Sequence, residues 1–266
     1  KLISAGKARN LIPGKSFSID TTGGIIAGIA ISILSAGILN TYQSLILVIT
    51  LGISYTILTF YLTGNTQKLV FKTAVLIASV FIIISSPDIL FRQLLLRGIK
   101  VTETDDTPYG NITIGEYHND TSIYYNQRLL IYNNDAVESE EDIHYAMLQT
   151  ESPDKVLLIS GPVISRLNEI NKYNVRKVVY VERDPALTKM EEPANQGSSS
   201  ILRIENEDAF RYVRKTDEKF DATIMLLPPP SSLSLNRYYT IEFFAAVKRK
   251  RNPDGGFSCS PGINPN

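Results

Sequence analysis

Glu182 is the residue of this chain whose position most clearly suggests a chemical role. It follows the second of two apolar runs, residues 155–160 and 177–181, and a helical pattern separates these runs. Gly161 ends the first run, so the acid comes about 20 residues after a glycine at a strand end. In a strand–helix–strand unit, this spacing puts a carboxylate where it can accept hydrogen bonds from the hydroxyls of a ribose. The spacing predicts a nucleotide-binding site.

Two other acids near strand ends have simpler explanations beside a binding role. Asp208 either binds a ligand at the end of its strand or caps the helix that begins near it. Asp184 precedes Pro185, and this pair favours a helix start. Gly161 stands alone where several glycines would let the backbone approach a ligand closely. The fold is therefore easier to predict from these residues than the activity.

The elements that must position these residues alternate between strands and helices. Expected strands cover residues 155–160, 177–182, 201–205, 220–226 and 256–259, and expected helices cover residues 163–173, 185–193, 207–214 and 239–249. Such alternation predicts an α/β fold with a Rossmann-like parallel sheet and helices on both faces. Ligands on this architecture bind beyond the carboxyl ends of the strands, where Gly161, Glu182 and Asp208 all map.

The composition excludes several classes of function. The 27 basic and 27 acidic side chains cancel, so the net charge gives no reason to expect a nucleic-acid partner. Cys259 is the single cysteine, and His118 and His144 are the only histidines in the 266 residues. The chain thus lacks the cysteine and histidine cluster of a zinc site, and we expect no metal site.

Residues 21–90 are overwhelmingly apolar, whereas the chain after about residue 101 is polar and mixed. Three segments, residues 22–39, 45–62 and 69–84, approach the roughly 20 apolar residues that span a bilayer. We interpret residues 1–100 as a membrane region with about three transmembrane helices. The alternative is a set of buried helices in a soluble protein. The first interpretation implies a multi-pass protein of the inner or plasma membrane, in contact with membrane lipid.

A different pattern connects the apolar part to the α/β part. Short β-rich stretches in residues 101–135, separated by turns that contain Asn, Asp and Gly, predict a small antiparallel sheet. We interpret the acidic stretch 138–142 as a linker. The expected organisation is a membrane region at 1–100, a small β-domain at 101–140 and a Rossmann-like domain at 141–266. We expect the chain to be a fragment, with helices missing upstream and sheet missing downstream.

Eight short motifs follow one another along residues 101–266: TPYGNITI, IHYAML, KVLLISG, VVYVERDPAL, NEDAF, FDATIML, RYYTIEFF and NPDG. Their order resembles that of the spermidine synthase (polyamine aminopropyltransferase) family, in the variety with N-terminal transmembrane helices. The resemblance implies a β-domain ahead of a methyltransferase-type Rossmann domain. It also implies aminopropyl transfer from decarboxylated S-adenosylmethionine, a co-substrate and not a permanently bound cofactor, to a polyamine. Glu182 would then accept from the ribose hydroxyls, and Asp208 would lie near the adenine amino group.

Several positions depart from the pattern of that family. The carboxylate that would deprotonate the attacking amine falls on Leu226, and a second acid of the same strand-end pattern falls on Pro229. Pro162, Val163 and Ile164 fill the rest of the glycine-rich loop. Because a leucine cannot take a proton, we expect the transfer to be impaired and assign no catalytic residue.

The retained and lost residues leave three functions open. The first is a membrane-anchored, spermidine synthase-like aminopropyltransferase in which Gly161, Glu182 and Asp208 bind the nucleoside. The second is a pseudoenzyme, whose Rossmann domain is a non-catalytic binding or assembly module of a membrane complex. The third is a methyltransferase that uses the same pocket. In each case we expect a homo-oligomer or a subunit of a membrane complex.

The orientation in the membrane follows from the expected co-substrate. Decarboxylated S-adenosylmethionine is a cytosolic metabolite, so we expect the soluble domain to be cytoplasmic. The basic residues Lys7, Arg9, Lys15 and Lys68 would lie on the opposite face, and they favour the reverse orientation.

Overall fold

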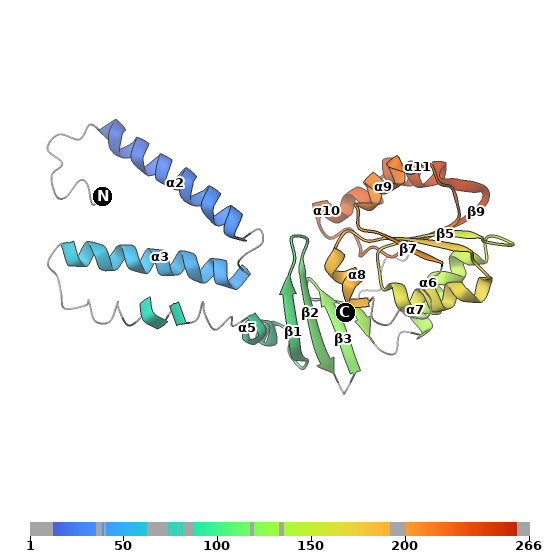
Figure 1. The fold of residues 1–266 in the computed structure, drawn as a ribbon, viewed down its shortest axis with the longest axis horizontal. Coiled ribbons are helices and arrows are strands. Elements are labelled where there is room, and N and C mark those ends of the chain that lie inside the picture. Colours follow the sequence, from blue (N-terminus) through green and yellow to red (C-terminus); the bar gives the residue numbers. More distant parts are fainter. Residues whose placement is uncertain are drawn as a thin grey trace. The chain divides into compact units, whose positions relative to one another are not determined.

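The computed structural model describes residues 13–35, 39, 41–62, 74, 76–78, 80–81, 88–117, 120–132, 136–191 and 201–259. The chain divides into two compact units, residues Lys1–Tyr117 and His118–Asn266. Figure 1 shows the course of the chain. The division falls inside the region expected to be a small β-domain, so boundaries after residues 100 and 140 stay predictions.

The first unit begins with two long apolar helices, α2 (Pro13–Ser35) and α3 (Thr41–Leu62). Both are long and apolar enough to cross a membrane, over Phe17–Leu34 and Thr41–Thr59, which is weak evidence of spans by itself. They overlap the first two predicted segments. The third predicted segment, residues 69–84, lies mostly outside the described residues. His118 also lies outside them.

A short helix and a hairpin complete the first unit. Helix α5 (Asp88–Leu95) leads into β1 (Lys100–Asp106), which pairs antiparallel with β2 (Asn111–Tyr117). In the second unit β3 (Asp120–Tyr125) pairs antiparallel with β4 (Arg128–Tyr132). The four strands have the order β1-β2-β3-β4 in one sheet, as the alternating pattern of residues 101–135 predicts.

The second unit is built on a parallel sheet of order β7-β6-β5-β8-β9. Its strands are β5 (Lys155–Ile159), β6 (Lys177–Val181), β7 (Leu202–Glu205), β8 (Phe220–Met225) and β9 (Arg251–Cys259). The order runs outward from β5 in both directions, so the topological switch point lies at β5 and β8. The carboxyl ends of these strands are therefore the expected place for a ligand.

Helices cover both faces of this sheet (Figure 1). They are α6 (Ala136–Met147), α7 (Val163–Ile170), α8 (Pro185–Glu191), α9 (Ala209–Lys215), α10 (Leu233–Asn236) and α11 (Ile241–Arg249), with 3-10 turns η1 (Asn171–Tyr173) and η3 (Arg237–Tyr239). Successive residues of β5 alternate between two cores. Leu157 and Ile159 pack in a cluster with residues of α9 and α11, and Val156 and Leu158 pack in a cluster with residues of α6 and α7.

The interpretation of residues 138–142 as a linker is wrong, because they form the middle of helix α6. The buried face of α6 includes Ser139 and Asp142 as well as apolar residues. Asp142 accepts hydrogen bonds from Nε and Nη2 of Arg166, at 3.1 and 2.7 Å, and the Arg166 side chain is only 3% exposed. The acidic stretch is polar by composition, but one of its acids is neutralised inside the domain.

Candidate functional site

The chain turns sharply at the carboxyl end of β5. Ser160 and Gly161 both have positive φ, 58° and 79°. Glycine adopts this left-handed conformation freely, whereas it costs an ordinary residue about 1–2 kcal/mol. The hydroxyl of Tyr180 donates to the carbonyl of Gly161 at 2.8 Å and holds the turn. This turn directs the side chain of Ser160 toward the neighbouring strand β6, where it meets Glu182.

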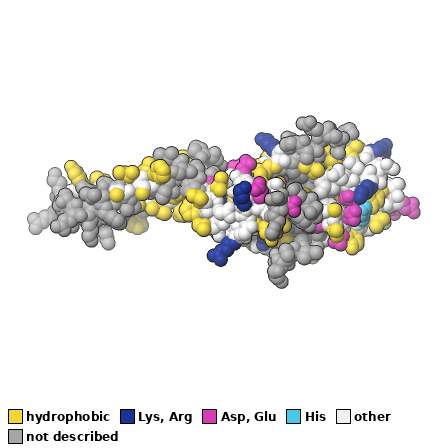
Figure 2. Space-filling view, turned by 90° about the horizontal axis from the view of Figure 1, so that it is seen from below, with side chains coloured by type: hydrophobic (Ala, Val, Ile, Leu, Met, Phe, Trp, Pro, Cys, Tyr) yellow, Lys and Arg dark blue, Asp and Glu magenta, His cyan; other side chains and the backbone are white. Residues whose placement is uncertain are grey.

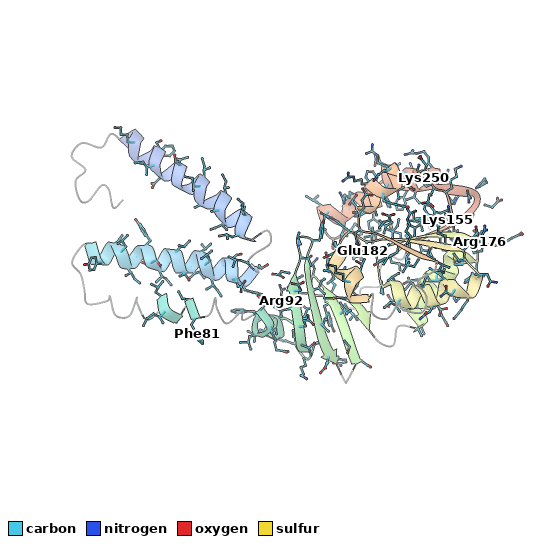
Figure 3. The ribbon with its side chains drawn as sticks, in the orientation of Figure 1. Phe81, Arg92, Lys155, Arg176, Glu182 and Lys250 are labelled. Atoms are coloured by element: carbon cyan, nitrogen blue, oxygen red, sulfur yellow. The ribbon has the colours of Figure 1, made fainter. Side chains whose placement is uncertain are left out.

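Glu182 follows β6 and has a buried carboxylate, 6% exposed (labelled in Figure 3). Ser160 Oγ donates to Glu182 Oε2 at 2.6 Å, and the backbone N–H of Asp184 donates to Oε1 at 3.0 Å. Burial raises the pKa of Glu182 above its ordinary value, against the lowering effect of these hydrogen bonds. Glu182 is thus a desolvated acceptor that already has a donor on each oxygen.

Leu226 lies against Gly161 at the end of β8. A Cβ placed on Gly161 would come within 2.6 Å of the Leu226 Cβ, and the Leu226 N–H donates to the Ile159 carbonyl at 2.9 Å. Glycine is therefore required at position 161 by the backbone angle and by Leu226. These two causes explain the retained glycine without a ligand, and its role in binding stays a prediction.

Asp208 caps helix α9 and is held by a second element. Its Oδ1 accepts from the backbone N–H of Arg211 at 3.0 Å. This bond caps the helix, which is one of the two roles that the sequence predicts for Asp208. Its Oδ2 accepts from the Arg237 guanidinium and from the Tyr238 hydroxyl. Tyr238 is buried, and burial raises the pKa of its phenol. The cap is present in the structure, whereas the contact with an adenine stays a prediction.

Tyr125, the last residue of β3, contacts the segment that follows β6. Its hydroxyl donates to Asp184 Oδ2 at 3.3 Å, while the Ala186 N–H donates to Oδ1 at 3.0 Å. Asp184 therefore starts helix α8, as its place before Pro185 predicts. Burial, then the charges of Asp184 and Glu182, raise the pKa of Tyr125, so the phenol keeps its proton at neutral pH.

Two of the three predicted site residues lie together. Gly161 is joined to Glu182 by Ser160, the residue between β5 and the glycine. Asp208 is held instead by Arg237 and Tyr238. Among the residues that the structure describes, no group of three or more His, Cys, Asp or Glu side chains could hold a metal ion.

The sequence did not single out Ser160, Arg237 or Tyr125. Ser160 had a signal, since it occupies the first position of a loop where a glycine is expected. Arg237 and Tyr125 had none, because their partners Asp208 and Asp184 lie 29 and 59 residues away in the chain.

Comparison with known proteins supports the resemblance to the spermidine synthase family. Residues 136–262 match the family described as "Spermine/spermidine synthase domain". The chain is 29% identical over 175 residues to a polyamine aminopropyltransferase of Oceanobacillus iheyensis, covering 62% of this chain and 34% of the relative. It is 36% identical over 125 residues to polyamine aminopropyltransferase 1 of Streptomyces coelicolor, covering 44% and 23%. The chain thus spans about a third or less of the length of these relatives.

Two solved structures show the fold. One is a spermidine synthase in complex with the transition state analogue AdoDATO, with a TM-score of 0.54, 22% identity and coverage of 60% of this chain and 57% of the other. The other is the spermidine synthase of Thermotoga maritima, with a TM-score of 0.50, 21% identity and coverage of 60% and 55%. The prediction of a small antiparallel sheet followed by a methyltransferase-type parallel sheet is confirmed. Over residues 136–262 the chain is thus similar to the spermine/spermidine synthase domain family, and over 175 residues it is similar to a curated polyamine aminopropyltransferase.

Proposed function

We propose that this chain is a membrane-anchored, spermidine synthase-like protein that binds the nucleoside of decarboxylated S-adenosylmethionine and transfers its aminopropyl group poorly. The observation that carries this proposal is the position of Leu226. It occupies the carboxyl end of β8, beside Gly161 and the turn that leads to Glu182. An apolar side chain there leaves the nucleoside-binding acid in place and removes the base.

The proposal that the chain binds the nucleoside rests on Glu182. A buried carboxylate at the end of the second strand can accept from both ribose hydroxyls, and its desolvation strengthens such bonds. The neighbouring spermidine synthase structure holds an analogue named AdoDATO, which agrees with a nucleoside as ligand. The printed names of the relatives support a polyamine as the acceptor.

The proposal that aminopropyl transfer is impaired rests on the chemistry of the acceptor. An amine attacks only after it loses its proton, and a positioned base typically contributes about 100- to 10,000-fold to such a step. Asp221, the acid in the same strand as Leu226, does not replace it. Its Oδ2 accepts from the backbone N–H groups of Asp154 and Lys155 at 3.0 and 2.8 Å, at the amino end of β5.

The proposal of membrane anchoring rests on helices α2 and α3. Their large apolar side chains are exposed, among them Phe17 at 75%, Ile29 at 58% and Leu51 at 55%. Figure 2 shows hydrophobic side chains on the surface of this part of the chain. Lipid would cover these side chains, as it covers the apolar surface of a transmembrane helix.

The test is turnover of decarboxylated S-adenosylmethionine and putrescine by the full chain, together with calorimetry of 5′-methylthioadenosine. We expect nucleoside binding and a turnover at least about 100-fold below that of a related enzyme. Leu226→Asp should raise the turnover, and the matched variant Leu226→Asn should not, because an amide cannot take a proton. Robust turnover by the unchanged protein would contradict the impairment, and absence of nucleoside binding would favour the assembly module.

A further inference from the structure

Helix α5 buries polar side chains and exposes apolar ones. Its polar residues Asp88 and Arg92 are 5% and 6% exposed, whereas Leu90 and Leu94 are 70% and 71% exposed. Leu95 is also exposed, at 51%. A helix on the surface of a soluble domain shows the opposite arrangement, with apolar side chains inward. The exposed side of α5 therefore has the character of a surface that faces lipid.

Contacts with the hairpin fix this orientation of α5. Arg92 Nη2 donates to Asp106 Oδ1 at 2.9 Å, in an ion pair whose side chains are 8% and 16% exposed (Arg92 is labelled in Figure 3). Gln93 Nε2 donates to the Ile99 carbonyl, and Gln93 Oε1 accepts from the Val101 N–H at 2.9 Å. Because these bonds use the polar side of α5, the apolar side must face outward.

The same aspartate ties α5 to the start of helix α3. Asp106 Oδ2 accepts from the N–H and the hydroxyl of Thr41, at 2.9 and 2.8 Å, and so caps the first turn of α3. Tyr42, the next residue, stacks on Phe91 of α5 with 4.8 Å between the ring centres, and Arg92 lies over the Tyr42 ring at 5.2 Å. Helix α5 is thus held at the level of the first turn of α3.

This placement identifies the occupant of the apolar side. If α3 crosses a bilayer, its first turn lies at the boundary between the headgroups and the acyl chains, and α5 lies there too. Leu45, near the start of α3, is also exposed, at 58%, as are Leu90 and Leu94 on α5. Arg97 follows the helix and is exposed, where a headgroup phosphate would attract it.

We infer that α5 is an interfacial helix that inserts Leu90, Leu94 and Leu95 into the boundary layer of the bilayer, while the Asp106–Arg92–Thr41 contacts hold the β1–β2 hairpin against the membrane. This inference rests on the proposed membrane anchoring. It goes further, because it names a second lipid contact outside the spans. An eight-residue helix binds lipid weakly alone, so the contacts with Asp106 are what keep it at the boundary.

The chain contains no tryptophan, so single tryptophans report on single positions. The experiment uses the full chain in vesicles that contain lipids brominated either near the headgroup end or near the methyl end of the acyl chain. Leu90→Trp and Leu94→Trp should lose most of their emission, and the lipids brominated near the headgroup should quench them more. Leu233→Trp is the control, since Leu233 is 92% exposed in α10 of the other unit, and it should be quenched by neither lipid.

Tyr55→Trp, in the middle part of α3, separates this inference from the membrane anchoring. If Tyr55→Trp is quenched by lipids brominated near the methyl end but Leu90→Trp and Leu94→Trp are not, the inference is overturned and the anchoring stands. If Tyr55→Trp is not quenched, the anchoring itself fails. Shielding of Leu90→Trp and Leu94→Trp from both brominated lipid and iodide in the water would mean that a protein surface, such as a second copy of the chain, covers α5.

Discussion

The Ser160 hydroxyl donates a hydrogen bond to one of the two oxygens of the Glu182 carboxylate, which a ribose would also use. The hydroxyl lies 2.6 Å from Glu182 Oε2, and a left-handed φ of 58° holds it there. A nucleoside that binds through Glu182 would therefore compete with the Ser160 hydroxyl for Oε2. The net value of such a bond is about 0.5–1.5 kcal/mol, rising to about 3 kcal/mol for a charged partner.

Replacing Ser160 should therefore strengthen nucleoside binding. We expect Ser160→Ala to lower the Kd for 5′-methylthioadenosine about fivefold to tenfold, since about 1–1.4 kcal/mol is no longer spent on the displaced bond. Ser160→Gly should do the same and also raise the thermal stability, because glycine adopts the left-handed conformation without strain. Calorimetry in a Glu182→Ala background is the control, and there Ser160→Ala should give no gain. A weaker affinity of Ser160→Ala would show instead that the hydroxyl itself contacts the ligand.

The sequence places Glu182 and Gly161 at strand ends but does not predict their contacts. Glu182 and Gly161 are found from spacing, because a strand–helix–strand unit fixes where each strand ends. The bond from Ser160 depends on a backbone angle that is unusual for serine, so the pattern of residue types does not contain it. The contact of Tyr125 with Asp184 depends on the placement of a β-hairpin, which no local pattern specifies.

At the scale of elements, strands were predicted more closely than the helix before them. The strands β5 and β6 are short apolar runs, which are typical of buried parallel strands. The sequence of helix α6, AVESEEDIHYAM, favours a linker because acids dominate its centre. Its buried face is recognised only when Asp142 is seen to pair with Arg166 of α7. The ion pair between Asp142 and Arg166 thus lets an acidic segment form a helix with a buried face, although its composition favours a linker.

Glu218 joins three parallel strands at their amino ends. Its carboxylate lies 3.0 Å from Lys155 Nζ of β5, 2.7 Å from Lys177 Nζ of β6 and 2.6 Å from Arg203 Nη1 of β7. The hydrogen bond from Lys177, then those from Lys155 and Arg203, lower the pKa of Glu218 from 4.5 to about 2, against the effect of burial. Because the folded state has the lower pKa, ionised Glu218 stabilises the fold above pH 4.5, and this contribution is lost as the pH falls toward about 2.

We expect Glu218→Gln to lower the free energy of unfolding by about 1 kcal/mol at neutral pH, a modest value because solvent screens these charges. The measurement is urea unfolding of the full chain, followed by circular dichroism, at neutral pH and at acidic pH approaching 2. The difference between the two proteins should shrink at acidic pH. Asp217→Asn removes the same charge from the exposed neighbouring residue and should have little effect. A difference that persists at acidic pH would indicate lost packing in place of lost charge.

At the scale of the whole molecule, the cap on α3 relates this apolar helix to the β1–β2 hairpin of its own unit. Asp106 of β1 caps α3 at Thr41, so the hairpin lies at the amino end of α3. If α3 spans a bilayer, Tyr61 near its carboxyl end lies on the other side. A third span between α3 and α5 stays a prediction, because residues 69–84 lie mostly outside the described residues.

The side of the membrane that holds the proposed nucleoside site decides whether a cytosolic co-substrate can reach it. A protein that uses a cytosolic sulfonium must present Glu182 to the cytoplasm, whereas the basic residues before the first span favour the opposite orientation through a small number of charges. We expect Leu233→Cys, in a Cys259→Ser background, to be protected from an impermeant maleimide in intact cells and to react after permeabilisation. Tyr61→Cys in the same background should react in intact cells, because Tyr61 is 69% exposed and lies at the far end of α3. Equal labelling of both positions would show that α3 does not span the membrane. Exchanged labelling would place the domain outside the cell, where no cytosolic co-substrate reaches it, and the aminopropyl transfer proposed for this chain would fail.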